Sequence, residues 1–226
     1  MSDEPLAFSP DQFGGLARVF PLPKLVMFPH VMQALHIFEP RYRAMLEEAL
    51  ADDRLIVMAT VASELEPADL PTRPPLEPVA CLCRIATHQL TPQGTYNVLL
   101  IGVRRVRLGR ELPALRPFRV IEAEILDEME PEITGGEALQ LQRDLLQAFK
   151  RTMPKLPDAQ LQLDELLGSQ VSLGMLTDIV AYTLDLDPEL KLRLLAECDV
   201  LRRTRLLLEG LAARGGRRFP PPFSRN

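Results

Sequence analysis

The chain has 226 residues and a formal net charge of −5 at pH 7, with 46% hydrophobic and 25% charged residues. This composition is typical of a globular protein, and the acidic charge excludes a global electrostatic attraction to nucleic acid. No apolar stretch approaches the about 20 residues of a membrane-spanning helix, and the acidic N-terminus does not resemble a secretory signal. Because the three cysteines cannot all pair, we expect a reducing, cytoplasmic compartment.

The first 131 residues hold 15 of the 21 prolines, and their apolar runs have the length of strands. Residues 1–15 are predicted to form a flexible leader, and residues 16–131 a β-rich domain. One helix interrupts this domain from Pro40, whose missing N–H suits a first helical position. The strands that the patterns predict cover residues 55–62, 79–85, 96–101, 103–108 and 118–126.

From residue 132 the apolar spacing becomes helical, which predicts a helical domain over residues 132–213 and a disordered basic tail over 214–226. Ser172 and Asp187 are typical helix caps. Besides the helix that Ser172 caps, the predicted helices cover residues 137–152, 158–167 and 188–213. A bundle seam, preferred over a dimeric coiled coil, is predicted along the last helix at Leu194, Cys198, Leu201, Arg205 and Leu208.

The sequence carries no local motif of a nucleotide-hydrolysing or serine-hydrolase site. It has neither the GxxxxGK loop that cradles phosphates nor the GxSxG turn that exposes a nucleophilic serine. Cys81 and Cys83 share the apolar face of a predicted strand, so we expect core packing rather than a metal or redox pair. We therefore predict a non-enzymatic chain with no catalytic residue, no cofactor and no metal.

Two further groups of polar residues have a structural and a functional interpretation. His30 and His36 lie six residues apart, a spacing that favours a structural or surface role over metal binding. Glu39 and Arg41 flank the proline that begins the helix, where the helix dipole favours a carboxylate. We therefore prefer a cap and ion-pair role for Glu39 over a role as general base.

Arg104, Arg105 and Arg107 form the main internal basic cluster. Alternation along a strand places Arg105 and Arg107 on one face, which we expect to be solvated. The cluster lacks the interleaved aromatic residues on which bases stack, so a nucleic-acid surface is the less favoured interpretation.

Several segments together resemble the N-terminal domain of the Lon protease family. Residues 19–30 (VFPLPKLVMFPH) and 35–43 (LHIFEPRYR) carry the most specific resemblance. Gly102 begins a basic strand similar to one in that family, and the resemblance extends over residues 16–213. His30 departs from the pattern, because the family commonly has glycine after Phe-Pro. The family-motif residues that we expect to be structural are Phe38, Glu39, Pro40, Arg41, Tyr42 and Gly102.

The resemblance implies an α+β fold in which a PUA-like, partly closed β-barrel with an inserted helix precedes a helical subdomain. It also implies a protein- or peptide-binding module, an adaptor in protein quality control that holds unfolded or peptide substrates. The alternatives are an RNA- or nucleotide-binding PUA-like module, which would use the arginine cluster, and an enzyme that uses Glu39 or a histidine. The candidate partner-binding residues are Met27, Phe28, His30, Ile37 and Phe38, but for any single one of them we favour packing inside the barrel over exposure.

Overall fold

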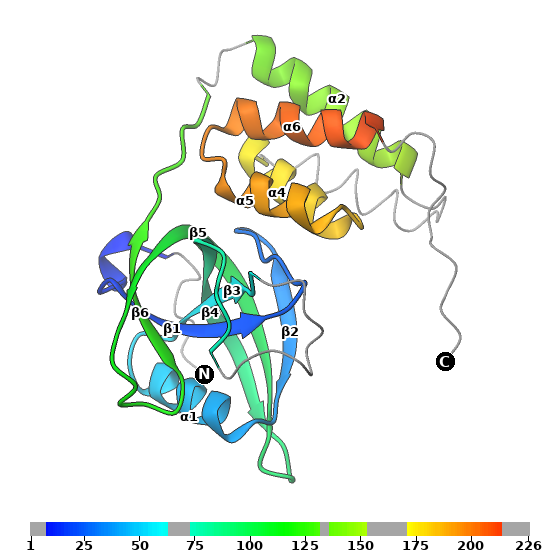
Figure 1. Cartoon of the computed structure of the whole chain (residues 1–226). Coiled ribbons are helices and arrows are strands. Elements are labelled where there is room, and N and C mark those ends of the chain that lie inside the picture. The colour runs from blue at the N-terminus through cyan, green and yellow to red at the C-terminus, as the bar shows by residue number, and fades with distance from the viewer. Residues whose placement is uncertain (1–7, 63–72, 132–135, 153–170, 214–226) are drawn as a thin grey trace. The chain divides into compact units, whose positions relative to one another are not determined.

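The computed structural model describes residues 8–62, 73–131, 136–152 and 171–213. The chain divides after Asp127 into two compact units, which we call the β unit and the helical unit (Figure 1). This division falls at residue 127 rather than at the predicted boundary, residue 131. The predicted helix over residues 158–167 and the predicted basic tail lie outside the described residues.

The β unit is a six-stranded mixed sheet that closes partly on itself. The strands follow the order β2-β5-β4-β3-β1-β6, and a further pairing between β5 and β6 closes a ring of five strands. β1 and β3 are parallel, whereas the other pairs are antiparallel. The strands are β1 (Leu16–Leu22), β2 (Met32–Ile37), β3 (Leu55–Thr60), β4 (Val79–Leu90), β5 (Tyr96–Glu111) and β6 (Arg119–Ile125).

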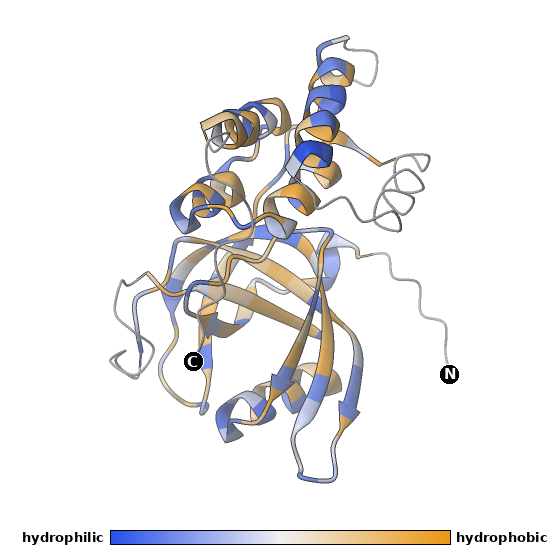
Figure 2. Cartoon of the chain, turned by 90° about the vertical axis from the view of Figure 1, so that its right-hand side faces the viewer, coloured by the Kyte–Doolittle hydropathy of each residue, from blue (hydrophilic) through white to orange (hydrophobic). Residues whose placement is uncertain are grey.

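The ring encloses the apolar core of the β unit, and Figure 2 shows hydrophobic residues along most of its strands. Val19, Val57 and Leu82 are fully buried there. Cys81 and Cys83 are also fully buried, which confirms the predicted core packing of both thiols. Part of the predicted leader packs on the barrel as well. It contains the short 3-10 helix η1 (Pro10–Gln12), and Phe8 and Phe13 pack against the core cluster.

The two strands predicted on either side of Gly102 are one continuous strand, β5, so the separation predicted at this glycine is wrong. Gly102 lies where the β4–β5 register shifts, opposite Cys83. A Cβ atom at Gly102 would lie 2.1 Å from the carbonyl oxygen of Phe28, so only glycine permits this approach of two backbone segments. The neighbouring His30 has a φ of 65°, in the left-handed region that glycine adopts without strain. His30, which stands where the family commonly has glycine, therefore lies in a strained turn.

Helix α1 (Pro40–Ala51), predicted from Pro40, packs next to β1 and β3. Its buried residues are Tyr42, Met45, Leu46 and Ala49. Arg18 of β1 ties the C-terminal end of the helix to the sheet. Its guanidinium donates to Glu48 (3.1 Å) and Asp53 (2.8 Å) and also pairs with Asp52. Burial alone would raise the pKa of Glu48, but hydrogen bonds from Arg116 and Arg18 outweigh it and hold that pKa below its usual value.

In its described part, the helical unit contains α2 (Gly136–Thr152), α4 (Leu173–Thr183), α5 (Pro188–Ala196) and α6 (Val200–Ala213). The predicted caps are confirmed. The Ser172 hydroxyl accepts from the Met175 N–H at 3.2 Å, and the Asp187 carboxylate accepts from the Glu189 N–H at 2.9 Å. Together, the two units confirm the α+β fold class, with a partly closed β-barrel, an inserted helix and helices that follow.

The last predicted helix is in fact two, because a backbone segment from elsewhere in the helical unit interrupts it. The Met129 N–H donates to the carbonyl of Cys198, and the Met129 carbonyl accepts from the N–H of Val200. Asp199 then caps α6 by accepting from the Arg202 N–H at 3.0 Å. The break changes the helical phase, so the predicted seam is wrong beyond Leu194. The buried residues of α6 are instead Val200, Arg203, Thr204 and Leu207.

A buried ionic cluster holds the helical unit together around Arg203. Its guanidinium lies 2.7 Å from the Glu128 carboxylate and 3.3 Å from that of Asp178, and it donates to the Glu197 carbonyl at 2.8 Å. Arg203 and Asp178 are fully buried. A buried charge of this kind is tolerated because partners of opposite charge surround it.

Candidate functional site

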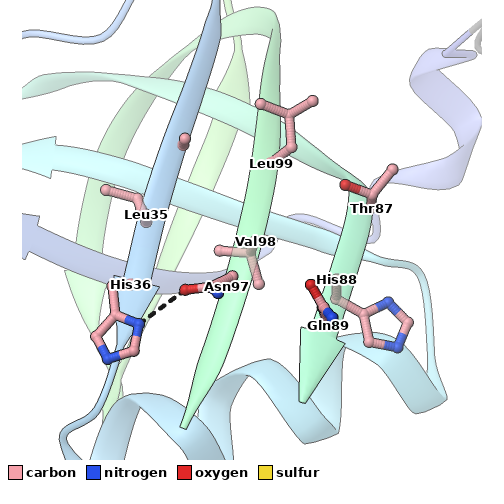
Figure 3. A pocket seen from close by; sticks show the side chains of 9 residues that line it. Leu35, His36, Thr87, His88, Gln89, Asn97, Val98 and Leu99 are labelled. Carbon is pink, nitrogen blue, oxygen red and sulfur yellow. Dashed lines mark hydrogen bonds between the residues drawn. The ribbon is translucent and has the colours of Figure 1, made fainter. Parts of the chain in front are cut away.

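A shallow, open hollow of about 580 Å³ lies on β2, β5 and β4 of the β unit (Figure 3). These three strands are neighbours in the sheet, with β5 in the middle. We call this surface the β2–β5–β4 face. The hollow is lined by Ala34, Leu35, His36, Thr87, His88, Gln89, Asn97, Val98 and Leu99.

A polar row crosses the β2–β5–β4 face at the level of His36. His36 is the register partner of Asn97, which in turn pairs with Gln89. The His36 Nδ1 atom lies 2.8 Å from Asn97 Oδ1, and Figure 3 shows these two side chains pointing toward each other. Amide and imidazole groups both donate and accept hydrogen bonds, so the row can bind uncharged polar groups such as peptide amides.

An exposed, mostly apolar row runs along β2 and the residue that follows it, at a spacing of two residues. Met32, Ala34, His36 and Phe38 are all exposed, and the side chains of Met32 and Phe38 are each 63% accessible. The His36 and Phe38 rings stack with centroids 6.2 Å apart. Because alternate residues of a strand point to one face, these four side chains lie together. We call them the edge row.

The hollow has no charged lining residue, and His36 and His88 are its only titratable groups. It also lacks a serine, cysteine or lysine that could act as nucleophile. Within the described part of the chain, no group of three or more histidine, cysteine, aspartate or glutamate side chains is placed to hold a metal ion. The arrangement therefore suits the binding of an uncharged or apolar ligand better than catalysis.

Three of the five residues predicted to bind a partner cannot form a surface. Met27, Phe28 and Ile37 are buried, as the favoured interpretation for single residues expects, so they contribute to no exposed patch. The Phe28 backbone packs directly on Gly102, and Ile37 is buried at the end of β2. Phe38 is exposed at the end of the edge row.

His30 is exposed at the strained turn before β2, and it is not among the residues that line the hollow. Its N–H donates to the Gly102 carbonyl at 2.8 Å.

The sequence predictions missed the residues that form the hollow, above all Asn97, Gln89 and Leu99. These residues lie close together because of the register of β5 with β2 and β4, and no local pattern in the sequence predicts that register. One usable signal was present. The alternation in MQALHI (residues 32–37) places Met32, Ala34 and His36 on a single face of a strand.

The three arginines proposed for nucleic-acid binding do not share a surface. Arg105 is fully buried, so the predicted solvated face is wrong at this position. The Arg104 guanidinium lies over the Phe8 ring at 5.5 Å, and Arg107 is exposed. Near this level β5 pairs with β4 on one edge and with β6 on the other.

The family-motif residues around the start of α1 have structural contacts. Glu39 occupies the N-cap position without a side-chain cap, and its carboxylate accepts instead from Arg41 Nε at 2.9 Å. The predicted ion pair is thus present, but the predicted cap is not. Arg41 lies over the Tyr42 ring at 4.6 Å, and the buried Tyr42 packs on Phe20 with centroids 4.4 Å apart. Pro40 is the first residue of the helix, as predicted.

No helix in the described part of the chain is long and apolar enough to cross a membrane. A family model described as the ATP-dependent protease La (LON) substrate-binding domain matches residues 17–213. The Lon protease of Heliobacterium modesticaldum is 28% identical over 200 residues, which are 86% of this chain and 23% of that protein. The Lon protease of Xanthomonas oryzae pv. oryzae is 30% identical over 193 residues, 84% of this chain and 22% of that protein. The chain thus spans about a quarter of the length of these relatives.

Two solved structures have the same fold. The N-terminal domain of Mycobacterium avium complex Lon protease superposes with a TM-score of 0.65 and 18% identity, over 87% of this chain and 98% of that one. A Lon N-terminal domain protein from Xanthomonas campestris superposes with a TM-score of 0.62 and 22% identity, over 86% of this chain and 97% of that one.

Proposed function

This chain belongs to the family of the ATP-dependent protease La (LON) substrate-binding domain, and from that premise we propose that its β2–β5–β4 face binds unfolded polypeptide segments. The family supports a substrate-binding role in general terms, and the surface chemistry supports this place for it. Exposed apolar side chains that gather on one face are typical of protein-binding sites. Unfolded chains expose the apolar side chains and peptide amides that such a face can bind.

The single observation that carries the proposal is the edge row beside an uncharged hollow. Met32 and Phe38 present their side chains to solvent, and no charged residue lines the hollow between β2 and β4. Burial of these two side chains by a ligand would contribute about 1.5–3 kcal/mol each. The polar row adds hydrogen-bonding groups for peptide amides. We further propose that the chain acts as a cytoplasmic adaptor that presents bound segments for proteolysis.

A titration with an unfolded protein tests this proposal. Reduced, carboxymethylated α-lactalbumin with a fluorescent label is the probe, and its native form is the negative control. We expect the unfolded form alone to bind, and the double variant Met32→Ser, Phe38→Ser to bind it at least about tenfold more weakly. Leu115→Ser is the matched control, because Leu115 is a leucine outside the hollow with 88% exposure. Equal weakening by the control, or no binding of the unfolded probe, would reject the proposal.

Binding of RNA or nucleotides, the alternative function, is not favoured by the arrangement of Arg104, Arg105 and Arg107. One of the three is fully buried and another stacks on an aromatic ring. Binding through phosphate contacts would weaken steeply as salt is added. A titration of RNA at several salt concentrations therefore tests this alternative directly.

A further inference from the structure

We propose that the bound polypeptide adds to the sheet as an extended strand along the outer edge of β2. This inference rests on the proposed function, since it concerns how the same surface holds its substrate. Among the residues that the structure describes, β2 pairs with β5 and with no other strand. It therefore has one side on which backbone groups are directed away from the sheet.

The hydrogen-bond pattern of β2 shows which residues direct their backbone groups outward. In an antiparallel pair, hydrogen-bonded and non-hydrogen-bonded residue pairs alternate. The Gly102 N–H donates to the Val31 carbonyl at 2.9 Å, which sets the phase at the start of β2. Because the alternation continues along β2, every second residue directs its backbone groups away from β5. The N–H and carbonyl groups of Met32, Ala34 and His36 therefore face the outer edge. The Ala34 carbonyl accepts from its neighbour's side chain, Gln33 Nε2, at 2.6 Å, as expected for an outward carbonyl.

The edge of β2 lacks the features that usually prevent strand addition. Natural edge strands are commonly protected by charged residues, proline or a β-bulge. Residues 32–37 (MQALHI) contain neither a charged residue nor proline. The register between β2 and β5 runs without a shift over six residue pairs, whereas the β4–β5 and β5–β6 ladders both contain irregularities. The edge is regular enough to accept another strand.

The side chains beside this edge indicate which segments it would accept. A strand added to β2 would place every second side chain next to the edge row. Met32, Ala34 and Phe38 offer apolar contacts, and His36 offers an imidazole ring that contacts Asn97. The occupant we infer is therefore an extended, uncharged polypeptide with apolar side chains at alternate positions. Main-chain hydrogen bonds would give affinity without demanding a particular sequence, as in other cases of strand addition.

Amide hydrogen exchange, resolved by residue with NMR, tests the inference on the unaltered chain. The probe is a synthetic peptide of alternating leucine and serine, compared with a peptide of the same length in which prolines replace some of the serines and break the extended strand. We expect the amides of Met32, Ala34 and His36 to exchange rapidly in the free chain and to become protected when the probe binds. The amide of Leu35, which faces β5, should be protected in both states.

A pair of substitutions at Ala34 provides a second test. Ala34→Pro removes an outward N–H without removing a hydrogen bond to β5, a position at which edge strands tolerate proline. Ala34→Ser keeps that N–H and is the matched control. We expect the peptide to bind Ala34→Pro about tenfold more weakly than Ala34→Ser, because one unmade hydrogen bond and the proline ring both oppose pairing.

The outcomes separate this inference from the proposed function. Binding that depends on Met32 and Phe38 but leaves the three outward amides unprotected would overturn the strand addition and leave the proposed function standing. No binding of any unfolded probe would overturn both. Protection that rises with protein concentration in the absence of peptide would show that a second copy occupies the edge, which would also overturn the inference.

Discussion

Replacement of Gly102 by alanine should destabilise the β unit strongly. The added Cβ would lie 2.1 Å from the Phe28 carbonyl oxygen and 2.9 Å from the carbonyl carbon, both of them backbone atoms that cannot rotate away. It would also lie 3.0 Å from Cys81 Sγ. Relief of these contacts requires a backbone shift, and overpacking of this kind costs about 1–3 kcal/mol.

Two hydrogen bonds add to the expected cost. Gly102 accepts from the His30 N–H at 2.8 Å and donates to the Val31 carbonyl at 2.9 Å, so a backbone shift would strain both. Loss of one of them would cost about 1 kcal/mol more. We therefore expect the free energy of unfolding to fall by about 2–4 kcal/mol.

Urea denaturation measures this loss, followed by circular dichroism because the chain has no tryptophan. A decrease of about 3 kcal/mol lowers the midpoint by about 1–2 M urea at an m-value of about 2 kcal/mol per M. Gly14→Ala is the matched control, because nothing lies within 4 Å of a Cβ at that position. A Gly102→Ala midpoint within error of the control would refute the close-approach argument.

Two other predictions concern the β unit. His30→Gly should stabilise it by about 0.5–1 kcal/mol, because the left-handed φ of 65° strains histidine and not glycine; a lower urea midpoint would contradict this. The pKa of Glu48 is held below its ordinary value of 4.5, so its ion pairs stabilise the fold above pH 4.5 and lose that contribution as the pH falls further. The free energy of unfolding of Glu48→Gln should therefore decrease less than that of the unaltered chain as the pH falls below 4.5. The same pH dependence in both chains would contradict the ion pairs of Glu48.

The local elements of the fold were predictable because their causes are local. Pro40 marks the start of α1, and Ser172 and Asp187 cap the helices predicted to follow them. Period-two alternation located the start of β4 and both ends of β6 to within one residue, but it missed the last five residues of β4. In each case a residue acts on its own neighbours in the chain, which is the information that a single sequence contains.

The errors came from contacts between residues far apart in the chain. The break between α5 and α6 depends on the backbone of Met129, about 70 positions away from Val200 along the chain. Arg105 is fully buried in β5, although an arginine in an alternating strand normally indicates solvent exposure. The periodicity of the sequence predicts neither the break between α5 and α6 nor the burial of Arg105.

The candidate site was predictable only in part, for the same reason. The sequence placed Phe38 and the segment before α1 in the binding region, and Phe38 is exposed there. The polar row of His36, Asn97 and Gln89 exists only because three strands pair in one register. A resemblance to a family predicts the presence of a binding domain, but the tertiary register decides which side chains meet on its surface.

The central claim is that unfolded polypeptide binds on the β2–β5–β4 face, and methionine methyl NMR tests it most directly. Met32 and Met129 are similarly exposed, at 63% and 59%, but Met32 lies in the edge row and Met129 in the helical unit. On addition of unfolded α-lactalbumin, we expect the methyl signal of Met32 to shift and broaden while that of Met129 stays in place. An unchanged Met32 signal under conditions in which the probe binds would contradict the claim.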